Sequence, residues 1–512
     1  MLPTATGGMS FSLSLPNEEA TRRFAIDIAA ALEPGDLVTL SGDLGAGKTT
    51  FARALIRYLA ADDAIDVPSP TFTLVQSYEL SRFPLVHADF YRLSGAAELA
   101  ELGLDDLPER AVVLLEWPDR AAGFLPPDRL DITFTLAPEL DPHARNVRVV
   151  GYGEFGASVE RMVQVRAFLA ESGFGDALRW RMVGDASTRI FERLRLDDQT
   201  VVLMNAPRRP DGPAVRDGKP YSAIAHLAED ILPYVAIANA LRDRNLSAPA
   251  IIHADLERGF VIMEDLGNEL IVEGDPPAPI EARYEAAVDL LVSLHRRKLP
   301  DSLSVAPHLD YRLRHYDLGA FLIEAELLLD WYLPRTGSSP AGSVRDEFIA
   351  LWEAALEPAI AAPATWVLRD YHSPNLLWLA ERESVARIGV LDFQDTLIGP
   401  PAYDVASLLQ DARVDVPEDM EVALLGRYVN ARRADDRRFD AAVFAMLYAT
   451  LAAQRATKIL GIFARLDRRD GKPQYLRHVP RLLGYLRRSL SHPALEPLAA
   501  WYAAHVLPRD TL

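Results

Sequence analysis

The chain has 512 residues, and its 73 acidic against 54 basic side chains give a formal net charge of −19. A surface this acidic repels a phosphate backbone, so direct binding of nucleic acid by this chain alone is not expected. Cysteine is absent, which excludes disulfides, thiolate catalysis and cysteine-ligated metal and fits a reducing cytoplasm. No apolar run approaches the roughly 18 residues of a membrane span. Residues 1–20 also lack the basic segment ahead of an apolar stretch that marks a secretory signal.

Helix and strand patterns alternate over residues 1–150. The predicted helices cover 18–32 and 49–59, and the predicted strands cover 36–40, 85–87, 111–115 and 130–136. Strands interleaved with helices predict a mostly parallel, three-layer α/β sheet. The pattern changes near residue 155, so we expect a first domain over residues 1–155.

The remaining residues, 156–512, are predicted to form one domain with two lobes. A helix over 159–171 is followed by strands at 191–196 and 201–205, a hairpin of 251–255 and 259–263, and long apolar-periodic helices after Pro279. This order predicts a small β-rich lobe at about 175–265 and a helical lobe at about 270–512. The whole chain is therefore expected to be an α/β domain followed by an α+β bilobal domain.

A phosphate-binding loop follows the first strand. Its sequence is Gly42-Asp43-Leu44-Gly45-Ala46-Gly47-Lys48-Thr49, followed by Thr50, and it fits the pattern G-x-x-x-x-G-K-[ST] between a strand and a helix. The glycines let the backbone curl its N–H groups around phosphate oxygens at a helix N-terminus. Lys48 is expected to reach the β/γ-phosphates of a nucleotide, and the Thr49 hydroxyl to bind Mg²⁺.

Lysine is scarce in this chain, which makes each lysine informative. Five are present, at positions 48, 219, 298, 458 and 472, and the other 49 basic residues are arginine. Lys48 is thus the only lysine before residue 219. A compositional bias explains the scarcity, but not why a lysine is kept inside the phosphate loop.

Two acidic residues at strand ends are candidates for the metal and the attacking water beside this loop. Asp89 follows the predicted strand 85–87, and Glu116 follows 111–115. An acid after a strand is commonly a turn or helix cap. Behind a phosphate-binding loop, however, it favours the acidic position of a P-loop NTPase.

Four motifs then indicate a family. Gly35–Thr50, Ser69–Val75 (SPTFTLV), His87–Arg92 (HADFYR) and Glu116-Trp117 together resemble TsaE, the ATPase subunit of the bacterial complex that forms threonylcarbamoyladenosine in tRNA, over about residues 12–150. The resemblance implies an α/β P-loop NTPase fold and an ATPase that acts through protein partners, which suits the acidic charge. It further implies that Thr49 and Glu116 serve Mg²⁺, that Asp89 serves the hydrolytic site, and that 69–73 form a nucleotide-sensing switch. Trp117 lies either near the nucleotide or in the core. The alternative is a small-molecule P-loop kinase, but such kinases usually carry an Arg-rich lid and this sequence shows no convincing one.

A second constellation lies in the other half. In Leu368-Arg369-Asp370-Tyr371-His372-Ser373-Pro374-Asn375 an Asp precedes an Asn by five positions, as in the catalytic loop of eukaryotic-like kinases. Asp370 is expected to orient the acceptor hydroxyl and take its proton, and Asn375 to bind Mg²⁺. Asp392 follows the apolar run 388–391, where the metal-binding Asp of such kinases stands. Leu368 departs from the His that is usual at its position.

Other parts of a kinase site are less distinct. The turn 184–189, with Ser187 and Arg189, is a candidate phosphate cover, and an ordinary polar turn explains it equally well. Glu264 to Leu266 resemble a hinge that reads adenine, and a capped turn is the alternative. The phosphate-pairing lysine of the third strand is missing, since that position is Met204. Arg189 or Arg193 is a possible substitute. His295 is expected to be a packed residue at a helix end.

The motifs GDAST-R, MEDLG, LRDYHSPNLLWL and LDFQDTLIGPPAYDVASLL resemble the aminoglycoside/choline-kinase superfamily over about 175–500. More narrowly, they are similar to anomeric kinases for N-acetylmuramate and N-acetylglucosamine in peptidoglycan recycling, where the third-strand lysine is likewise not expected. This resemblance implies phosphate transfer from ATP to a sugar, and a bracing role for Asp404. The alternatives are an aminoglycoside, choline or homoserine kinase, a protein kinase, or a silent regulatory module. The segment 314–334 is either part of the acceptor site or a packed helix.

Overall fold

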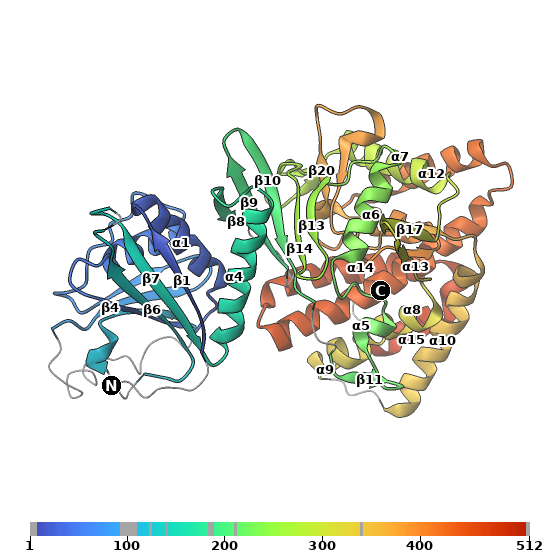
Figure 1. The fold of residues 1–512 in the computed structure, drawn as a ribbon. Coiled ribbons are helices and arrows are strands. Elements are labelled where there is room, and N and C mark those ends of the chain that lie inside the picture. The colour runs from blue at the N-terminus through green and yellow to red at the C-terminus, as the bar shows by residue number, and fades with distance from the viewer. Residues whose placement is uncertain are drawn as a thin grey trace. The chain divides into compact units, whose positions relative to one another are not determined.

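The computed structural model describes residues 8–92, 110–121, 125–139, 141–182, 189–208, 212–337 and 341–507. The chain divides into two compact units, 1–205 and 206–512, which are considered separately below (Figure 1). This division falls inside the small lobe expected at about 175–265. The functional boundary expected at 155/156 stays a prediction.

The first unit alternates strands and helices, as its sequence predicts. Its elements are β1 (Met9–Leu15), α1 (Glu18–Ala31), β2 (Leu37–Ser41), α2 (Lys48–Ala60), β3 (Val75–Glu79), β4 (Pro84–Asp89), β5 (Val112–Glu116), β6 (Arg129–Leu136), β7 (Arg145–Tyr152), α4 (Phe155–Glu171), β8 (Leu178–Arg181), β9 (Ile190–Leu196) and β10 (Gln199–Asn205). The predicted helices and strands are all present, with ends that differ by a few residues. β1, β3, β7 and β8 are additional strands that the sequence pattern did not predict.

The main sheet has seven strands in the order β1-β7-β6-β2-β5-β4-β3. The four strands β6, β2, β5 and β4 are parallel, whereas β7 and β1 at one edge and β3 at the other pair antiparallel. The expected mostly parallel sheet is therefore confined to its centre. The physical reason is connection length, because the few residues between β3 and β4 are too short for the crossover that a parallel pair requires.

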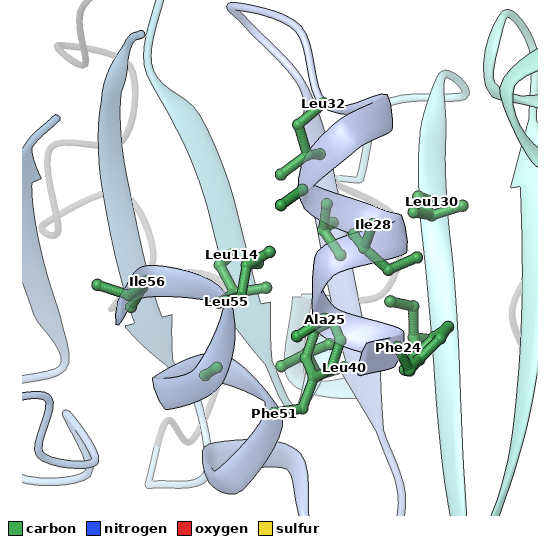
Figure 2. Close-up of a cluster of buried hydrophobic side chains, with 14 of the residues drawn as sticks. Phe24, Ala25, Ile28, Leu32, Leu40, Phe51, Leu55, Ile56, Leu114 and Leu130 are labelled. Carbon is green, nitrogen blue, oxygen red and sulfur yellow. The ribbon is translucent and has the colours of Figure 1, made fainter. Parts of the chain in front are cut away.

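Helices α1 and α2 bury their apolar sides against one face of this sheet (Figure 2). Phe24 and Ile28 of α1 and Phe51 and Leu55 of α2 are fully buried there, together with Leu114 of β5. The neighbouring strand residues Val113 and Leu115 pack in a smaller cluster on the other face. The alternation follows from the two-residue period of a strand. Because β2, β5 and β4 are parallel, their carboxyl ends lie at the same end of the sheet.

The rest of the first unit is α4 and an antiparallel group of three strands. β9 pairs with β8 on one side and with β10 on the other. Met204 of β10 lies opposite Phe191 of β9 and is fully buried. The two strands predicted at 191–196 and 201–205 are thus confirmed as neighbours, and Met204 is a core residue.

The second unit is mainly helical. Its helices are α5 (Tyr221–Ile224), α6 (Leu232–Arg242), α7 (Glu281–His295), α8 (Leu318–Ala325), α9 (Leu333–Arg335), α10 (Gly342–Ala361), α11 (Ala402–Leu409), α12 (Glu418–Asp435), α13 (Ala441–Asp470), α14 (Val479–Leu490) and α15 (Glu496–His505). Among its described residues the strands form six antiparallel pairs, five of which are β11 (Ala214–Arg216) with β12 (Lys219–Pro220), β13 (Ile251–Asp255) with β14 (Phe260–Glu264), β15 (Val272–Glu273) with β16 (Ala278–Pro279), β17 (Ser302–Ala306) with β18 (Leu309–Arg312), and β20 (Leu376–Trp378) with β21 (Ile388–Val390).

A sixth pair completes the scaffold of the predicted catalytic loop. β19 (Thr365–Val367) pairs antiparallel with β22 (Leu397–Gly399), so residues 368–375 leave from one ribbon and enter another at β20.

The long helix α13 is buried along most of its length, and Gly461 within it approaches Leu327 so closely that a Cβ would lie 2.4 Å from the Leu327 carbonyl carbon. No helix among the described residues is long and apolar enough to cross a membrane.

Candidate functional sites

The phosphate-binding loop joins β2 to α2, as predicted. Gly42 has φ +133°, and a Cβ there would lie 2.3 Å from the carbonyl oxygen of Phe134, so only glycine fits this position. Gly47 caps α2 in the left-handed conformation with φ +107°. Asp43, Leu44 and Gly45 form the exposed tip of the loop, and Ala46 is buried. The backbone N–H groups of Lys48, Thr49 and Thr50 in the first turn of α2 therefore lie next to a loop that can surround an anion.

Lys48 is folded back over this loop. Its Nζ donates to the carbonyl oxygens of Gly42 at 2.8 Å and Asp43 at 3.0 Å, and it lies 3.9 Å from the centre of the Trp117 ring. Burial lowers the pKa of Lys48, against the opposing effect of Glu116, Asp89 and Asp43. Of the two positions considered for Trp117, the structure places its ring beside Lys48, the lysine predicted to bind phosphate.

Glu116 and Asp89 stand at the ends of neighbouring parallel strands. They are opposite each other in the β4–β5 register, and each is 2% exposed. The Thr49 hydroxyl donates to both carboxylate oxygens of Glu116, at 3.1 and 3.2 Å. The structure thus brings together Thr49 and Glu116, two oxygen ligands expected for Mg²⁺, from positions far apart in the sequence.

Asp89 connects the site to the segment 69–73. Its Oδ2 accepts hydrogen bonds from the hydroxyls of Ser69 at 3.2 Å and Thr71 at 2.9 Å, and its Oδ1 accepts from the Tyr91 backbone N–H at 2.9 Å. The Tyr91 ring lies 5.0 Å from the ring of Trp117, measured between centroids. The orientation of the Asp89 carboxylate therefore depends on the position of the segment 69–73.

Two further residues around this site were missed by the sequence-based prediction. His87 lies in β4, and its Nε2 is 3.0 Å from Glu116 Oε1. Arg145, at the start of β7, donates from Nε to the carbonyl oxygen of Ala46 at 3.0 Å. His87 belongs to one of the four motifs of the first domain, so the signal was present. Nothing local marks Arg145, because its partner lies about a hundred positions before it in the chain.

In the second unit, the predicted catalytic loop and Asp392 meet through the backbone. Leu391 donates its N–H to the carbonyl oxygen of Asn375 at 2.9 Å, and Leu376 pairs with Val390 in the β20–β21 ribbon. Asn375 Nδ2 donates to the Asp370 carbonyl oxygen at 2.9 Å, which leaves its side-chain oxygen for another partner. Asp370, Asn375 and Asp392 thus come from one compact turn region, and all three are partly exposed.

Asp404 braces this loop, as expected. It is fully buried at the start of α11 and accepts from the backbone N–H groups of Leu368 at 2.6 Å and Arg369 at 3.0 Å. Burial raises the pKa of Asp404 to about 7, although these two hydrogen bonds oppose the shift. Arg369 has φ +65°, a strained conformation for a residue with a side chain, and the two hydrogen bonds help to hold it.

A buried cluster of charged residues lies behind the catalytic loop. Glu324 of α8 is fully buried and pairs with the Arg369 guanidinium and with Lys458 Nζ, the latter at 2.9 Å. The Tyr316 hydroxyl also donates to Glu324. Burial by itself would raise the pKa of Glu324, but Lys458 and Arg369 outweigh it and lower that pKa. Lys458 was missed as a site residue, and the scarcity of lysine was the signal that could have found it.

The same cations act on Asp370. Burial opposes its ionisation, yet the positive charges of Lys458 and, less strongly, Arg369 lower the pKa of Asp370 below its ordinary value. His372 Nε2 lies 3.9 Å from Asp370 Oδ1, and burial lowers the pKa of His372 to about 4. Asp370 is therefore ionised at neutral pH, as an acceptor of a hydroxyl proton must be.

The other residues predicted for the kinase site have different surroundings. Ser187 lies outside the described residues, and Arg189 lies just before β9. The Glu264 carboxylate pairs with Arg242 and Arg382 and accepts from the Ala250 N–H at 3.1 Å. The Glu264 backbone N–H donates to the Ala250 carbonyl oxygen at 2.9 Å.

His295 is a packed residue, as expected, and its Nδ1 is 2.8 Å from the Tyr428 hydroxyl. In the segment 314–334, Tyr316 and Glu324 are buried partners and Asp317 caps α8, so packing accounts for these three. Within the described ranges, no three Asp, Glu or His side chains gather to hold a metal by themselves.

Comparison with known proteins assigns two segments of the chain to two families, and the motifs of each family lie within its segment or close to it. Residues 15–146 match the family model described as threonylcarbamoyl adenosine biosynthesis protein TsaE, and residues 181–443 match the phosphotransferase enzyme family. The N-acetylmuramate/N-acetylglucosamine kinase of Caulobacter vibrioides is 38% identical over 362 residues, which are 68% of this chain and 98% of that protein. The corresponding kinase of Pseudomonas aeruginosa is 32% identical over 344 residues, 66% of this chain and 92% of that protein. The tRNA threonylcarbamoyladenosine biosynthesis protein TsaE of Rickettsia felis is 38% identical over 127 residues, 25% of this chain and 74% of that protein.

Proposed function

Because the chain belongs to the TsaE family over residues 15–146 and to the phosphotransferase enzyme family over residues 181–443, we propose that it is a bifunctional enzyme. Its first part hydrolyses ATP in support of threonylcarbamoyladenosine formation in tRNA. Its second part transfers a phosphate from ATP to the anomeric hydroxyl of N-acetylmuramate or N-acetylglucosamine, in cell-wall recycling. The names and coverage of the relatives support both assignments. We place the functional boundary at 155/156, with a small lobe at about 175–265 and a helical lobe at about 270–512.

The contact of Thr49 with Glu116 carries the ATPase assignment. It joins a hydroxyl at the start of α2 to a carboxylate at the end of β5, at 3.1 and 3.2 Å. Hard cations such as Mg²⁺ prefer oxygen ligands and commonly take one or two from protein and the rest from phosphate and water, so these residues fit the ion. Mg²⁺ bound there would neutralise charge on the phosphates.

In this site the N–H groups from Gly45 to Thr49 hold the β-phosphate. Lys48 gives up its hydrogen bonds to the carbonyl oxygens of Gly42 and Asp43 and binds phosphate oxygens instead. Asp89 orients the water whose oxygen attacks the γ-phosphorus, while the bond to ADP breaks. Because Ser69 and Thr71 hold Asp89, their segment reports the state of the nucleotide to partner proteins of the threonylcarbamoyl-transfer complex. The chain's formal charge of −19 supports an indirect role toward tRNA.

The backbone link between Leu391 and Asn375 carries the kinase assignment. It keeps the side-chain oxygens of Asn375 and Asp392 close enough to the catalytic loop to serve Mg²⁺ on the phosphates of ATP. Asp370 accepts the proton of the anomeric hydroxyl while the hydroxyl oxygen bonds to the γ-phosphorus and ADP leaves. An anomeric hydroxyl is more acidic than an ordinary alcohol, so an ionised carboxylate is a sufficient base. The backbone of Glu264–Leu266 reads adenine.

Two experiments on the full-length chain test these assignments separately. Lys48→Ala is expected to abolish hydrolysis at the first site and threonylcarbamoyladenosine formation in a strain that carries only this variant. Normal tRNA modification in that strain would refute the first assignment. The second experiment offers N-acetylmuramate, N-acetylglucosamine, kanamycin, choline and homoserine in parallel, with Asp370→Ala as control. Turnover of kanamycin, choline or homoserine alone would refute the sugar assignment, and no Asp370-dependent turnover would indicate a silent module.

The location of the protein is also a proposal. ATP, tRNA and sugars released during cell-wall recycling meet in the cytoplasm, and the absence of cysteine is consistent with that compartment. We therefore place both activities in the cytoplasm. Fractionation of cells with an antibody against the chain tests this, and recovery with the membrane fraction would contradict it.

A further inference from the structure

The proposed ATPase mechanism gives no role to a histidine that is buried beside Glu116. His87 lies in the middle of β4 and is 0% exposed, and its register partner on β5 is Leu114. Its imidazole extends toward the end of β5, where Nε2 lies 3.0 Å from Glu116 Oε1. The contact is therefore made inside the sheet and away from solvent.

The direction of this hydrogen bond follows from its partner. A carboxylate oxygen only accepts, so Nε2 carries the hydrogen and donates it to Glu116. The other ring nitrogen, Nδ1, has no partner within the part of the chain that the structure describes. Leaving a buried polar atom unpaired costs about 1–3 kcal/mol. An apolar residue would fill a core position without that cost, which indicates that the donor is kept for Glu116.

Glu116 has two donors, and they differ in their dependence on the nucleotide. Thr49 donates to both carboxylate oxygens from the start of α2, but Thr49 is itself assigned to Mg²⁺ in the proposed function. His87 is held by the sheet and belongs to no loop of the site. It is therefore the donor that stays in place when the hydroxyl of Thr49 turns toward another partner.

We propose that His87 is a positioning residue of the ATPase site, which orients the Glu116 carboxylate toward the Mg²⁺ that accompanies the nucleotide. This role rests on the proposed ATPase function and extends it to a residue outside the ligand set. Hydrogen-bond partners of metal-binding groups typically change metal affinity or activity by about 10–100-fold when they are removed. A loss of that size is expected when His87 loses its donor.

Metal binding by the full-length chain gives a test that does not depend on turnover. Asp392→Ala is introduced first, to remove the metal site of the kinase half. Mn²⁺ affinity is then measured by electron paramagnetic resonance with a non-hydrolysable ATP analogue, and affinity for the analogue alone is measured in EDTA. His87→Leu is expected to weaken Mn²⁺ binding about 10–100-fold and to leave the metal-free affinity unchanged.

Two amide variants separate positioning from packing. The amide of Gln reaches the place of Nε2, whereas the shorter Asn does not, so His87→Gln is expected to restore Mn²⁺ binding and His87→Asn is not. Equal affinities in His87→Gln and His87→Asn would overturn the proposal, as would wild-type affinity in His87→Leu. If His87→Leu does not fold, the comparison of Gln with Asn, which differ by one methylene, still decides.

Lys48→Ala and Glu116→Gln distinguish failure of this proposal from failure of the function beneath it. If both abolish the Mn²⁺ signal while His87→Leu does not, only the role of His87 is wrong. If neither changes the signal, the first site does not bind metal and nucleotide, and the ATPase assignment and the role of His87 fail together.

Discussion

Asp27 of α1 and Arg179 of β8 form a buried ion pair within the first compact unit. Asp27 is 4% exposed and Arg179 8% exposed, and Arg179 also donates to both carboxylate oxygens of Glu192, at 2.7 and 3.0 Å. Asp27 lies within residues 15–146, which match the TsaE family, whereas Glu192 lies within residues 181–443, which match the phosphotransferase enzyme family. The segments matched to the two families are therefore joined by a buried polar network, and its residues are too far apart in the sequence to be recognised as partners.

Removing one charge of this network is expected to destabilise the first unit. Asp27→Asn leaves Arg179 with one carboxylate where it now has two, and breaking a buried pair costs about 3–5 kcal/mol. The thermal transition of the full-length chain should fall by several degrees. Arg23→Ala is the control, because the Arg23–Asp176 pair lies at the surface with side chains 31% and 85% exposed. Its loss should cost at most about 1 kcal/mol, and equal effects of the two variants would contradict this view of the network.

Gly42 should be far more sensitive to substitution than a glycine in open space. Gly42→Ala places a Cβ 2.3 Å from the Phe134 carbonyl oxygen at a positive φ, and such backbone strain costs about 1–3 kcal/mol. We expect weaker nucleotide binding at the phosphate loop, measured by calorimetric titration in the Asp392→Ala background. A Cβ at Gly156 in α4 would lie more than 4 Å from the described residues that surround this helix, so Gly156→Ala should bind as the parent does. Unchanged binding in Gly42→Ala would mean that the loop adopts another conformation.

Lys458 should set the acidic limit of the kinase reaction. It is the first of the cations that lower the pKa of Asp370, so Lys458→Met should raise that pKa. A base with a higher pKa becomes protonated at higher pH, and the acidic limb of kcat/KM against pH should therefore move upward. Lys298 is exposed, and Lys298→Met serves as the control whose profile matches the parent. A profile that keeps its acidic limb in Lys458→Met would show that Asp370 is not under the control of this lysine.

His295 should make the second unit sensitive to acid. Burial lowers the pKa of His295 from 6.5 to about 3, so the unfolded chain binds a proton there at a pH where the folded chain does not. Its contribution to stability is present above about pH 6.5 and is lost as the pH falls toward 3, by up to about 1.4 kcal/mol per pH unit. His295→Asn keeps an amide near Nδ1 without titrating, and should make the free energy of unfolding fall less steeply between pH 6.5 and 4.5. His308 is exposed, and His308→Asn should leave the slope as it is; equal slopes in all three proteins would contradict the assignment.

The sequence by itself determined the two chemical sites to the extent that their residues are close along the chain. The loop Gly42–Thr49 and the turn from Asp370 to Asn375 depend on a few consecutive backbone conformations, and the residue types that permit them are specific enough to be read directly. The alternating pattern also predicted the strands that end at Asp89 and Glu116. It missed the antiparallel strands β1, β3, β7 and β8, because pairing direction depends on connections and partners that no single segment contains.

Only the tertiary structure decided which side chains control these groups. His87 meets Glu116 through the register of two parallel strands, Lys458 of α13 meets Glu324 and acts on Asp370 across the helical core, and Arg145 closes on Ala46 from another strand. None of these residues stands beside its partner in the chain. Burial then sets the electrostatics, since a charge removed from water interacts strongly with the few charges left near it. Local pattern fixes a backbone conformation, whereas the orientation and pKa of a catalytic group depend on neighbours brought together by packing.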